Sequence, residues 1–253
     1  MNDIIDALEA QHNELRALIA TCTGDDWQRL SPCEGWDIGD VVLHLAQADE
    51  LAVASAQGKL DGHANGFLSD RPDRALSVDA AAAAQVANER AIGGERIGQR
   101  WDASATQLVG ELRALDPRQR VTWVAGKLSI HTLAATRLSE CWIHSGDVAT
   151  ALGVELAATD RLRHIARLAW RTLPYAFERA GLTMQGAVEM HLTGPSGDTW
   201  DYVPDVIALT TITGSVEEFC AVAARRVDAS GTALVGTGPD AANALRLVRT
   251  YAQ

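Results

Sequence analysis

Apolar residues recur at helical spacing in four long segments of the first 153 residues, and this pattern constrains the fold more than any other feature. The segments cover residues 2–21, a stretch beginning after Asp37, residues 78–115 and residues 129–152. Asp37 and Ser129 stand at positions typical of helix N-caps, and Gly153 provides a C-terminal stop. The first 153 residues are therefore predicted to be mainly helical.

The pattern changes after Gly153. The remaining residues predict a helix at 160–180, a strand at 187–193, a hairpin turn at 194–198, a return strand at 199–203, a helix at 215–226, a short strand at 233–236 and a last helix opening at Gly238-Pro239. This order indicates a small α+β unit. We therefore expect two domains, residues 1–153 and 154–253.

Three further stretches interrupt the helical pattern of the first domain. Residues 58–74 are rich in Gly, Asp, Asn and Pro, which predicts a long irregular connection that could act as a lid. Gly93-Gly94 and Gly98 are expected to bend or break the third helical segment. Residues 121–126 favour a short β-prone or extended link before the fourth helix.

The charge balance restricts the partners of this chain. Its 22 basic and 33 acidic residues give a net charge of −11, which repels nucleic acid and anionic lipid. The N-terminus lacks the basic start and apolar run of a signal peptide, and no segment approaches the roughly 20 apolar residues that span a bilayer. The four cysteines form no Cys-x-x-Cys pair. We expect a cytoplasmic protein with reduced thiols, no nucleic-acid or membrane partner, and a monomeric or homodimeric state.

A candidate metal site can be identified from three residues. Glu140 and His144 are four apart in the fourth helical segment, so their side chains project from one face about one turn apart. His44, in the second helical segment, is the natural third ligand. Two nitrogens and one carboxylate suit zinc and leave one position open, as in catalytic sites. The alternatives are an exposed Glu–His pair on one helix and a hydrogen-bonded core histidine.

Other polar residues near these positions allow two interpretations each. Asp147 is a candidate for an outer-sphere carboxylate and Arg137 for binding a substrate acid group, and each could equally be an ordinary surface charge. His12 is expected to be a surface or interhelix histidine, with lining of the site as the alternative. His131 is too far along the helix to share the metal, and Cys141 is expected to be a core thiol.

Two motifs carry a resemblance to a known family. Cys33-Glu-Gly-Trp36-Asp-Ile-Gly-Asp-Val-Val-Leu-His44-Leu-Ala and Arg137-Leu-Ser-Glu140-Cys-Trp-Ile-His144-Ser-Gly-Asp147 resemble the mycothiol-dependent maleylpyruvate isomerase family, within the DinB-like superfamily. The resemblance covers nearly the whole chain. It implies a four-helix bundle that holds a divalent metal, usually zinc, through His44, Glu140 and His144, followed by an α+β domain similar to sterol-carrier folds.

The resemblance also implies a chemistry. The family's isomerase acts on a small unsaturated dicarboxylate with the thiol mycothiol as cosubstrate, and relatives transfer such thiols. An arginine of the C-terminal domain faces the metal in that family, for which Arg225 or Arg226 is the candidate here, with a solvated basic pair as the alternative. We expect a metal-dependent isomerase or thiol S-transferase. A thiol-independent metal enzyme and a non-catalytic metal-dependent binding protein stay open as alternatives.

Overall fold

The computed structural model describes residues 3–60, 78–124 and 126–250, which fall into two compact units. The N-terminal unit contains the described residues up to Leu156, and the C-terminal unit begins at Ala157. The boundary expected at residue 153 stays a prediction, because compactness alone does not show that a unit folds independently. Most of the connection expected at residues 58–74 lies outside the described residues.

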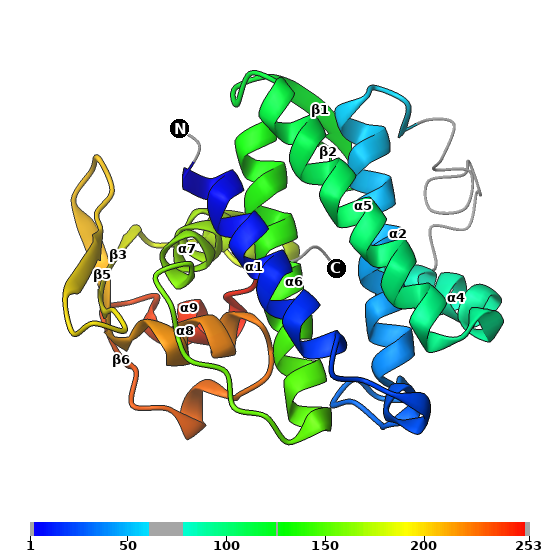
Figure 1. Ribbon diagram of the computed structural model, residues 1–253. Helices are drawn as coiled ribbons and strands as arrows, with labels where there is room; N and C mark the ends of the chain where they lie inside the picture. Colours follow the sequence, from blue (N-terminus) through cyan, green and yellow to red (C-terminus); the bar gives the residue numbers. More distant parts are fainter. Residues whose placement is uncertain (1–2, 61–77, 125, 251–253) are drawn as a thin grey trace. The chain divides into compact units, whose positions relative to one another are not determined.

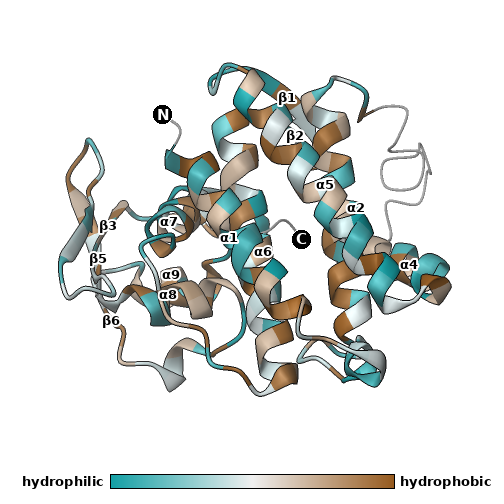
Figure 2. Cartoon of the chain, viewed as in Figure 1, coloured by the Kyte–Doolittle hydropathy of each residue, from teal (hydrophilic) through white to brown (hydrophobic). Residues whose placement is uncertain are grey.

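Four long helices of the described N-terminal unit form a bundle. They are α1 (Asp3–Ile19), α2 (Ile38–Ala56), α5 (Gly94–Ala114) and α6 (Ile130–Leu152). Helix α2 packs against α5 and α6, and α1 packs against the same two helices, which closes the ring (Figure 1). Apolar and polar residues alternate around each helix (Figure 2), so the apolar faces meet inside the bundle. The expected four-helix bundle is confirmed.

The two helices that carry the candidate ligands begin where the sequence places their caps. The carboxylate of Asp37 accepts a hydrogen bond from the backbone N–H of Asp40 at 2.8 Å, ahead of α2. The hydroxyl of Ser129 accepts one from the backbone N–H of Thr132 at 3.1 Å, ahead of α6. Gly153 ends α6 in the left-handed conformation, with φ 72°. Local capping therefore sets the start of both helices and the end of α6.

The third helical segment is broken, as the glycines predict. Helix α4 (Val78–Glu89) is followed by the 3-10 turn η2 (Arg90–Ile92), and Gly93, with φ 90°, separates this turn from α5. The β-prone link expected before α6 does contain a strand, but that strand is paired with a second one that was not expected. Together they form a hairpin of β1 (Arg120–Trp123) and β2 (Gly126–Ser129). A short 3-10 turn, η1 (Gly24–Gln28), connects α1 to the loop before α2.

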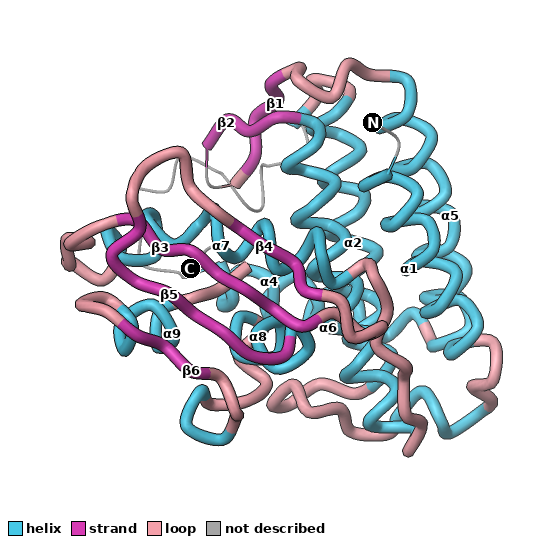
Figure 3. Tube along the Cα trace, turned by 90° about the vertical axis from the view of Figure 1, so that its left-hand side faces the viewer, coloured by secondary structure: helices cyan, strands magenta, loops and turns pink. Residues whose placement is uncertain are grey.

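The C-terminal unit is a four-stranded sheet covered by helices on one face (Figure 3). Its elements are α7 (Leu162–Arg179), β3 (Ala187–Thr193), β4 (Thr199–Tyr202), β5 (Ala208–Ser215), α8 (Val216–Ala223), η3 (Ala229–Gly231), β6 (Val235–Thr237) and α9 (Ala241–Leu247). The strand order is β4-β3-β5-β6. Strands β3 and β5 are parallel, and the two outer pairs are antiparallel.

The α+β prediction is confirmed, although one strand was missed. The sequence analysis predicted the hairpin of β3 and β4 but missed the inner strand β5, although its stretch Ala-Leu-Thr-Thr-Ile-Thr is rich in β-branched residues and follows the turn signal Pro204-Asp205. Helix α9 begins after Asp240, two residues later than the proline expected to open it. Among the described residues, no helix is long and apolar enough to cross a membrane.

Candidate metal centre

The structure brings together the three residues predicted to bind a metal. The Nε2 atom of His44 on α2 lies 2.8 Å from Oε1 of Glu140 on α6. The imidazole rings of His44 and His144 have centroids 5.1 Å apart and stand nearly perpendicular. One ligand atom from each of the three residues lies within 4.8 Å of the others. The candidate site therefore combines the Glu140–His144 pair of α6 with His44 from the neighbouring helix α2.

The spacing and chemistry of these atoms fit a divalent cation. Ligand atoms about 2.1 Å from one zinc ion at tetrahedral angles lie roughly 3.4 Å apart, so small side-chain rotations would suffice for all three to bind. The side chains of His44, Glu140 and His144 are 14%, 26% and 12% exposed. They are thus held by the protein on one side and open to solvent on the other. Partial exposure of this kind is compatible with a fourth ligand from solution.

The protonation of these groups also suits metal binding. Although burial by itself raises the pKa of Glu140, the guanidinium of Arg137 and the nearby His44 outweigh it and hold that pKa far below its usual range. Burial lowers the pKa of His144, and this effect exceeds the opposing attraction of Asp147. Glu140 is therefore ionised and His144 neutral at pH 7. A metal requires a carboxylate and imidazoles in these forms.

Asp147 and Cys33 lie directly behind His144. Oδ2 of Asp147 is 2.9 Å from Nδ1 of His144 and accepts a hydrogen bond from Sγ of Cys33 at 3.2 Å. Because Nδ1 faces this carboxylate, the ring proton of neutral His144 lies on Nδ1. The lone pair of Nε2 is then available to a metal. This arrangement is the outer-sphere role considered for Asp147. The sequence analysis did not predict the contact of Cys33 with Asp147. Its one indication was the position of Cys33 in the motif that precedes α2.

Arg137 occupies a different place from the one expected. Its side chain is 1% exposed, with Nε donating to Oδ1 of Asp49 at 3.0 Å and Nη1 donating to Oε2 of Glu140 at 2.5 Å. This placement corrects the expectation that Arg137 holds a substrate acid group. A guanidinium enclosed in the bundle and paired with two carboxylates does not present its donors to a molecule in solution.

The other histidines and thiols considered lie apart from the three ligands. His12 on α1 is buried beside the ring of Trp101, with Nε2 3.9 Å from Oδ2 of Asp49, so it is an interhelix histidine. His131 is exposed at the start of α6, and Cys141 is a buried core thiol. These placements agree with the interpretations preferred from the sequence.

Arg225 and Arg226 lie directly after α8 in the C-terminal unit. Nη1 of Arg225 donates to the carbonyl of Arg246 at 2.8 Å, and Nη1 of Arg226 donates to the carbonyl of Ala224 at 3.1 Å. The backbone of Arg225 has φ 60°, a left-handed conformation that is uncommon for a residue with a side chain. A substrate-binding role for either arginine stays a prediction.

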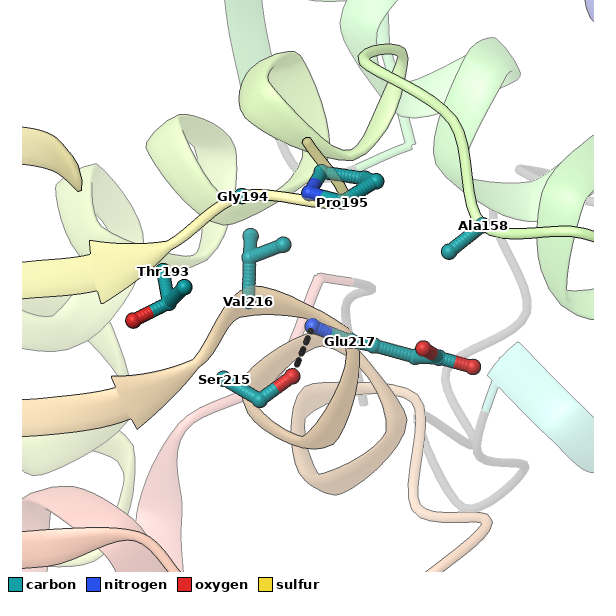
Figure 4. A pocket seen from close by; sticks show the side chains of 7 residues that line it. All are labelled: Ala158, Thr193, Gly194, Pro195, Ser215, Val216 and Glu217. Carbon is teal, nitrogen blue, oxygen red and sulfur yellow. Dashed lines mark hydrogen bonds between the residues drawn. The ribbon is translucent and has the colours of Figure 1, made fainter. Parts of the chain in front are cut away.

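The C-terminal unit also contains a pocket, at the point where β5 passes into α8 (Figure 4). The hydroxyl of Ser215 accepts a hydrogen bond from the backbone N–H of Glu217 at 3.2 Å at its edge. Its lining residues are Ala158, Thr193, Gly194, Pro195, Ser215, Val216 and Glu217. Neither Arg225 nor Arg226 lines this pocket.

The fold and the site together define a class: a protein of two compact units whose helical bundle carries a candidate mononuclear metal centre of two histidines and one glutamate. The sequence profile described as "Mycothiol maleylpyruvate isomerase N-terminal domain" matches residues 8–149, which include all three candidate ligands. The chain belongs to this family. The resemblance seen in its two motifs is thereby confirmed.

Two kinds of relative accompany this match. Uncharacterized proteins from two strains of Mycobacterium tuberculosis, CDC 1551 and H37Rv, are each 34% identical over 246 residues, covering 97% of this chain and 93% of theirs. The crystal structure of the mycothiol-dependent maleylpyruvate isomerase is similar with a TM-score of 0.61 at 15% identity, covering 93% of this chain and 92% of that one. A mutant of that enzyme gives a TM-score of 0.58 at 15% identity, covering 87% of each chain. These structures share the fold.

Proposed function

We propose that this protein is a zinc-dependent enzyme that acts on a small carboxylate-bearing metabolite, with mycothiol as cosubstrate, as an isomerase or a thiol S-transferase. The observation that carries the proposal is the meeting of His44, Glu140 and His144 at one partly exposed point between α2 and α6. Family membership supports an enzyme of this type and supports a low-molecular-weight thiol as partner.

Each residue of the centre has a defined task in this proposal. His44, Glu140 and His144 would hold the zinc ion, which supplies a Lewis acid that lowers the pKa of a thiol or water bound in the open position. Asp147 accepts the Nδ1 proton of His144 and so keeps the Nε2 lone pair directed to the site. The ring of Trp36, 5.2 Å from that of His44, forms an apolar wall beside the ligands.

The substrate class rests on charge. A carboxylate-bearing metabolite needs a cationic partner, and the arginine nearest the three ligands is enclosed and paired with Asp49 and Glu140. Arg225 and Arg226, the candidates that the family resemblance implies, are the proposed partners of the substrate carboxylate. A guanidinium suits this role because its forked donors match the two oxygens of a carboxylate.

A thiol-independent metal enzyme is the second candidate, and it differs only in what occupies the open position. The partial exposure of the three ligands is the observation that permits it, because a partly exposed site also admits water. A non-catalytic binding protein is the third candidate. Turnover measurements separate the three.

The first experiment measures zinc content of the purified protein beside His44→Ala and Glu140→Gln variants. We expect about one zinc ion per wild-type chain and a loss in both variants, since two remaining ligands bind zinc weakly. His131→Ala is the matched control, because His131 lies on the same helix as Glu140 and outside the centre. Equal zinc content in wild type and His44→Ala would contradict the proposal.

The second experiment measures conversion of maleylpyruvate by the zinc-loaded protein with and without mycothiol. Turnover that requires mycothiol supports the proposal, and turnover without it supports the thiol-independent candidate. Transfer of mycothiol to an electrophile, with no isomerisation, would identify an S-transferase. Tight binding without any turnover would favour the binding protein.

A further inference from the structure

The buried charges behind the metal centre form a chain of contacts from α2 to α6. Asp49 on α2 and Arg137 on α6 are 2% and 1% exposed, and their side chains are joined by the Nε to Oδ1 hydrogen bond of 3.0 Å. Arg137 also reaches Glu140, one turn along its own helix. A guanidinium enclosed in a protein is costly unless it is paired, so these contacts hold its position closely.

The two oxygens of Glu140 are used in different ways. Oε2 accepts the hydrogen bond from Nη1 of Arg137 at 2.5 Å, while Oε1 lies 2.8 Å from Nε2 of His44. Since Oε2 is held on the Arg137 side, only Oε1 faces the imidazoles. A carboxylate held in this way offers one oxygen to a metal.

We propose that Asp49 and Arg137 are positioning residues that make Glu140 a one-oxygen ligand. Arg137 withholds Oε2 from the metal, and Asp49 fixes Arg137 through a contact to the neighbouring helix. The inference rests on the proposed function only in taking Glu140 as a metal ligand. In this proposal, Asp49 and Arg137 determine how many coordination positions of the metal stay open for a thiol or substrate.

Helix α2 contributes two residues to this arrangement. It supplies the ligand His44 and, five residues later, the anchor Asp49, whereas α6 supplies the ligand Glu140 and the intermediary Arg137. Two contacts therefore join the same pair of helices, one at the metal and one behind it. Loss of the rear contact removes the anchor that holds Arg137 against Oε2, so that the Glu140 carboxylate can turn both oxygens toward the ion.

The test compares Asp49→Asn and Arg137→Lys with wild type by two measurements on the full chain. Zinc affinity is measured by competition with a chromophoric chelator, and coordination is followed by the visible absorption of the Co²⁺-substituted protein. Outer-sphere changes of this kind lower metal affinity about 10- to 100-fold. We also expect weaker Co²⁺ absorption in the variants, because five-coordinate cobalt absorbs less than four-coordinate cobalt.

Arg100→Lys is the matched control. Arg100 also bridges two carboxylates across helices, donating to Glu50 of α2 and to Glu89 of α4, but it contacts none of the three ligands. We expect its zinc affinity and Co²⁺ spectrum to equal those of wild type. A loss of affinity in Arg100→Lys as large as in Arg137→Lys would show a general effect of bundle stability and would overturn the proposal.

Two further comparisons separate the positioning role from the metal centre itself. Unchanged affinity and an unchanged Co²⁺ spectrum in Asp49→Asn, a substitution that keeps the side-chain shape, overturn the proposal even where Arg137→Lys does not fold. His44→Ala is measured alongside. If His44→Ala loses zinc while Asp49→Asn and Arg137→Lys do not, the positioning role alone is wrong. If His44→Ala keeps zinc, the proposed metal centre is wrong.

Discussion

Asp147 lies one turn beyond His144 on α6, and its Oδ2 is 2.9 Å from Nδ1 of that histidine. The same oxygen accepts a hydrogen bond from Cys33 in the loop before α2. A buried carboxylate thus joins a candidate ligand to a segment more than a hundred residues away. The contact leaves Nε2 as the nitrogen of His144 that is available to the candidate metal site.

The first prediction concerns this contact. Replacing Asp147 with Ala removes the acceptor of the Nδ1 proton, so His144 loses its fixed tautomer and ring orientation. We expect zinc affinity to fall about 10- to 100-fold, as measured by chelator competition. Cys33→Ser is the control, because its hydroxyl still donates to Asp147, and it should change affinity less than threefold. Equal affinities for wild type and Asp147→Ala would refute this role.

The second prediction concerns pH and His12. Burial, aided by Arg137 and Arg16, lowers the pKa of His12 to about 3 from 6.5. Between these values the unfolded chain binds more protons than the folded one, so the free energy of unfolding falls as pH falls below 6.5. We expect His12 to account for a loss of about 2 kcal/mol between pH 7 and pH 5.

Urea unfolding of wild type and His12→Gln at both pH values measures this loss. The pKa of Asp49 is raised to about 6 by burial, which acts in the opposite direction, but Asp49 is present in both proteins. The prediction therefore concerns the difference between them: His12→Gln should lose about 2 kcal/mol less than wild type on acidification. Parallel losses in the two proteins would contradict it.

The third prediction compares two glycines of α5. A Cβ atom on Gly94 would lie 2.1 Å from Cγ of Trp27, whereas one on Gly110 would have no atom within 4 Å. Gly94→Ala should therefore destabilise the bundle by about 2 kcal/mol or more through overpacking. Gly110→Ala should stabilise it by about 1 kcal/mol, since alanine is the better helix former. Thermal unfolding tests both, and equal effects of the two changes would contradict the packing argument.

The fourth prediction concerns Arg225. The backbone N–H groups of Arg225 and Arg226 donate to the carbonyls of Val222 and Ala221, which is the Schellman pattern that usually has glycine in the place of Arg225. Because φ is 60° there, Arg225→Gly should stabilise the protein by about 1 kcal/mol. If Arg225 binds the substrate carboxylate, kcat/KM falls at the same time.

Arg226→Gly is the control for that measurement. Arg226 is not among the described residues with a positive φ, so glycine there brings no relief of strain and should leave stability unchanged or lower it. A stability gain in Arg226→Gly equal to that in Arg225→Gly would contradict the conformational argument. A stability of Arg225→Gly below that of wild type would also contradict the conformational argument.

Local features of the sequence were sufficient to predict the helices of the bundle and two of the three candidate ligands, Glu140 and His144. Asp37, Ser129 and Gly153 act through hydrogen bonds to residues a few positions away, so their capping roles depend on neighbours in the sequence. The pairing of Glu140 and His144 follows likewise from helical periodicity. The break at Gly93 is equally local, because it depends on the freedom of one residue to adopt a positive φ.

Packing between distant segments determined the rest. The contact of His44 with Glu140 spans 96 residues and exists only because α2 and α6 lie side by side. Charge alone made Arg137 resemble a substrate-binding residue, yet the bundle encloses it between two carboxylates. Whether a polar side chain meets solvent, a metal or a counter-charge depends on which helix faces lie together, and periodicity within one segment carries no information about its neighbour.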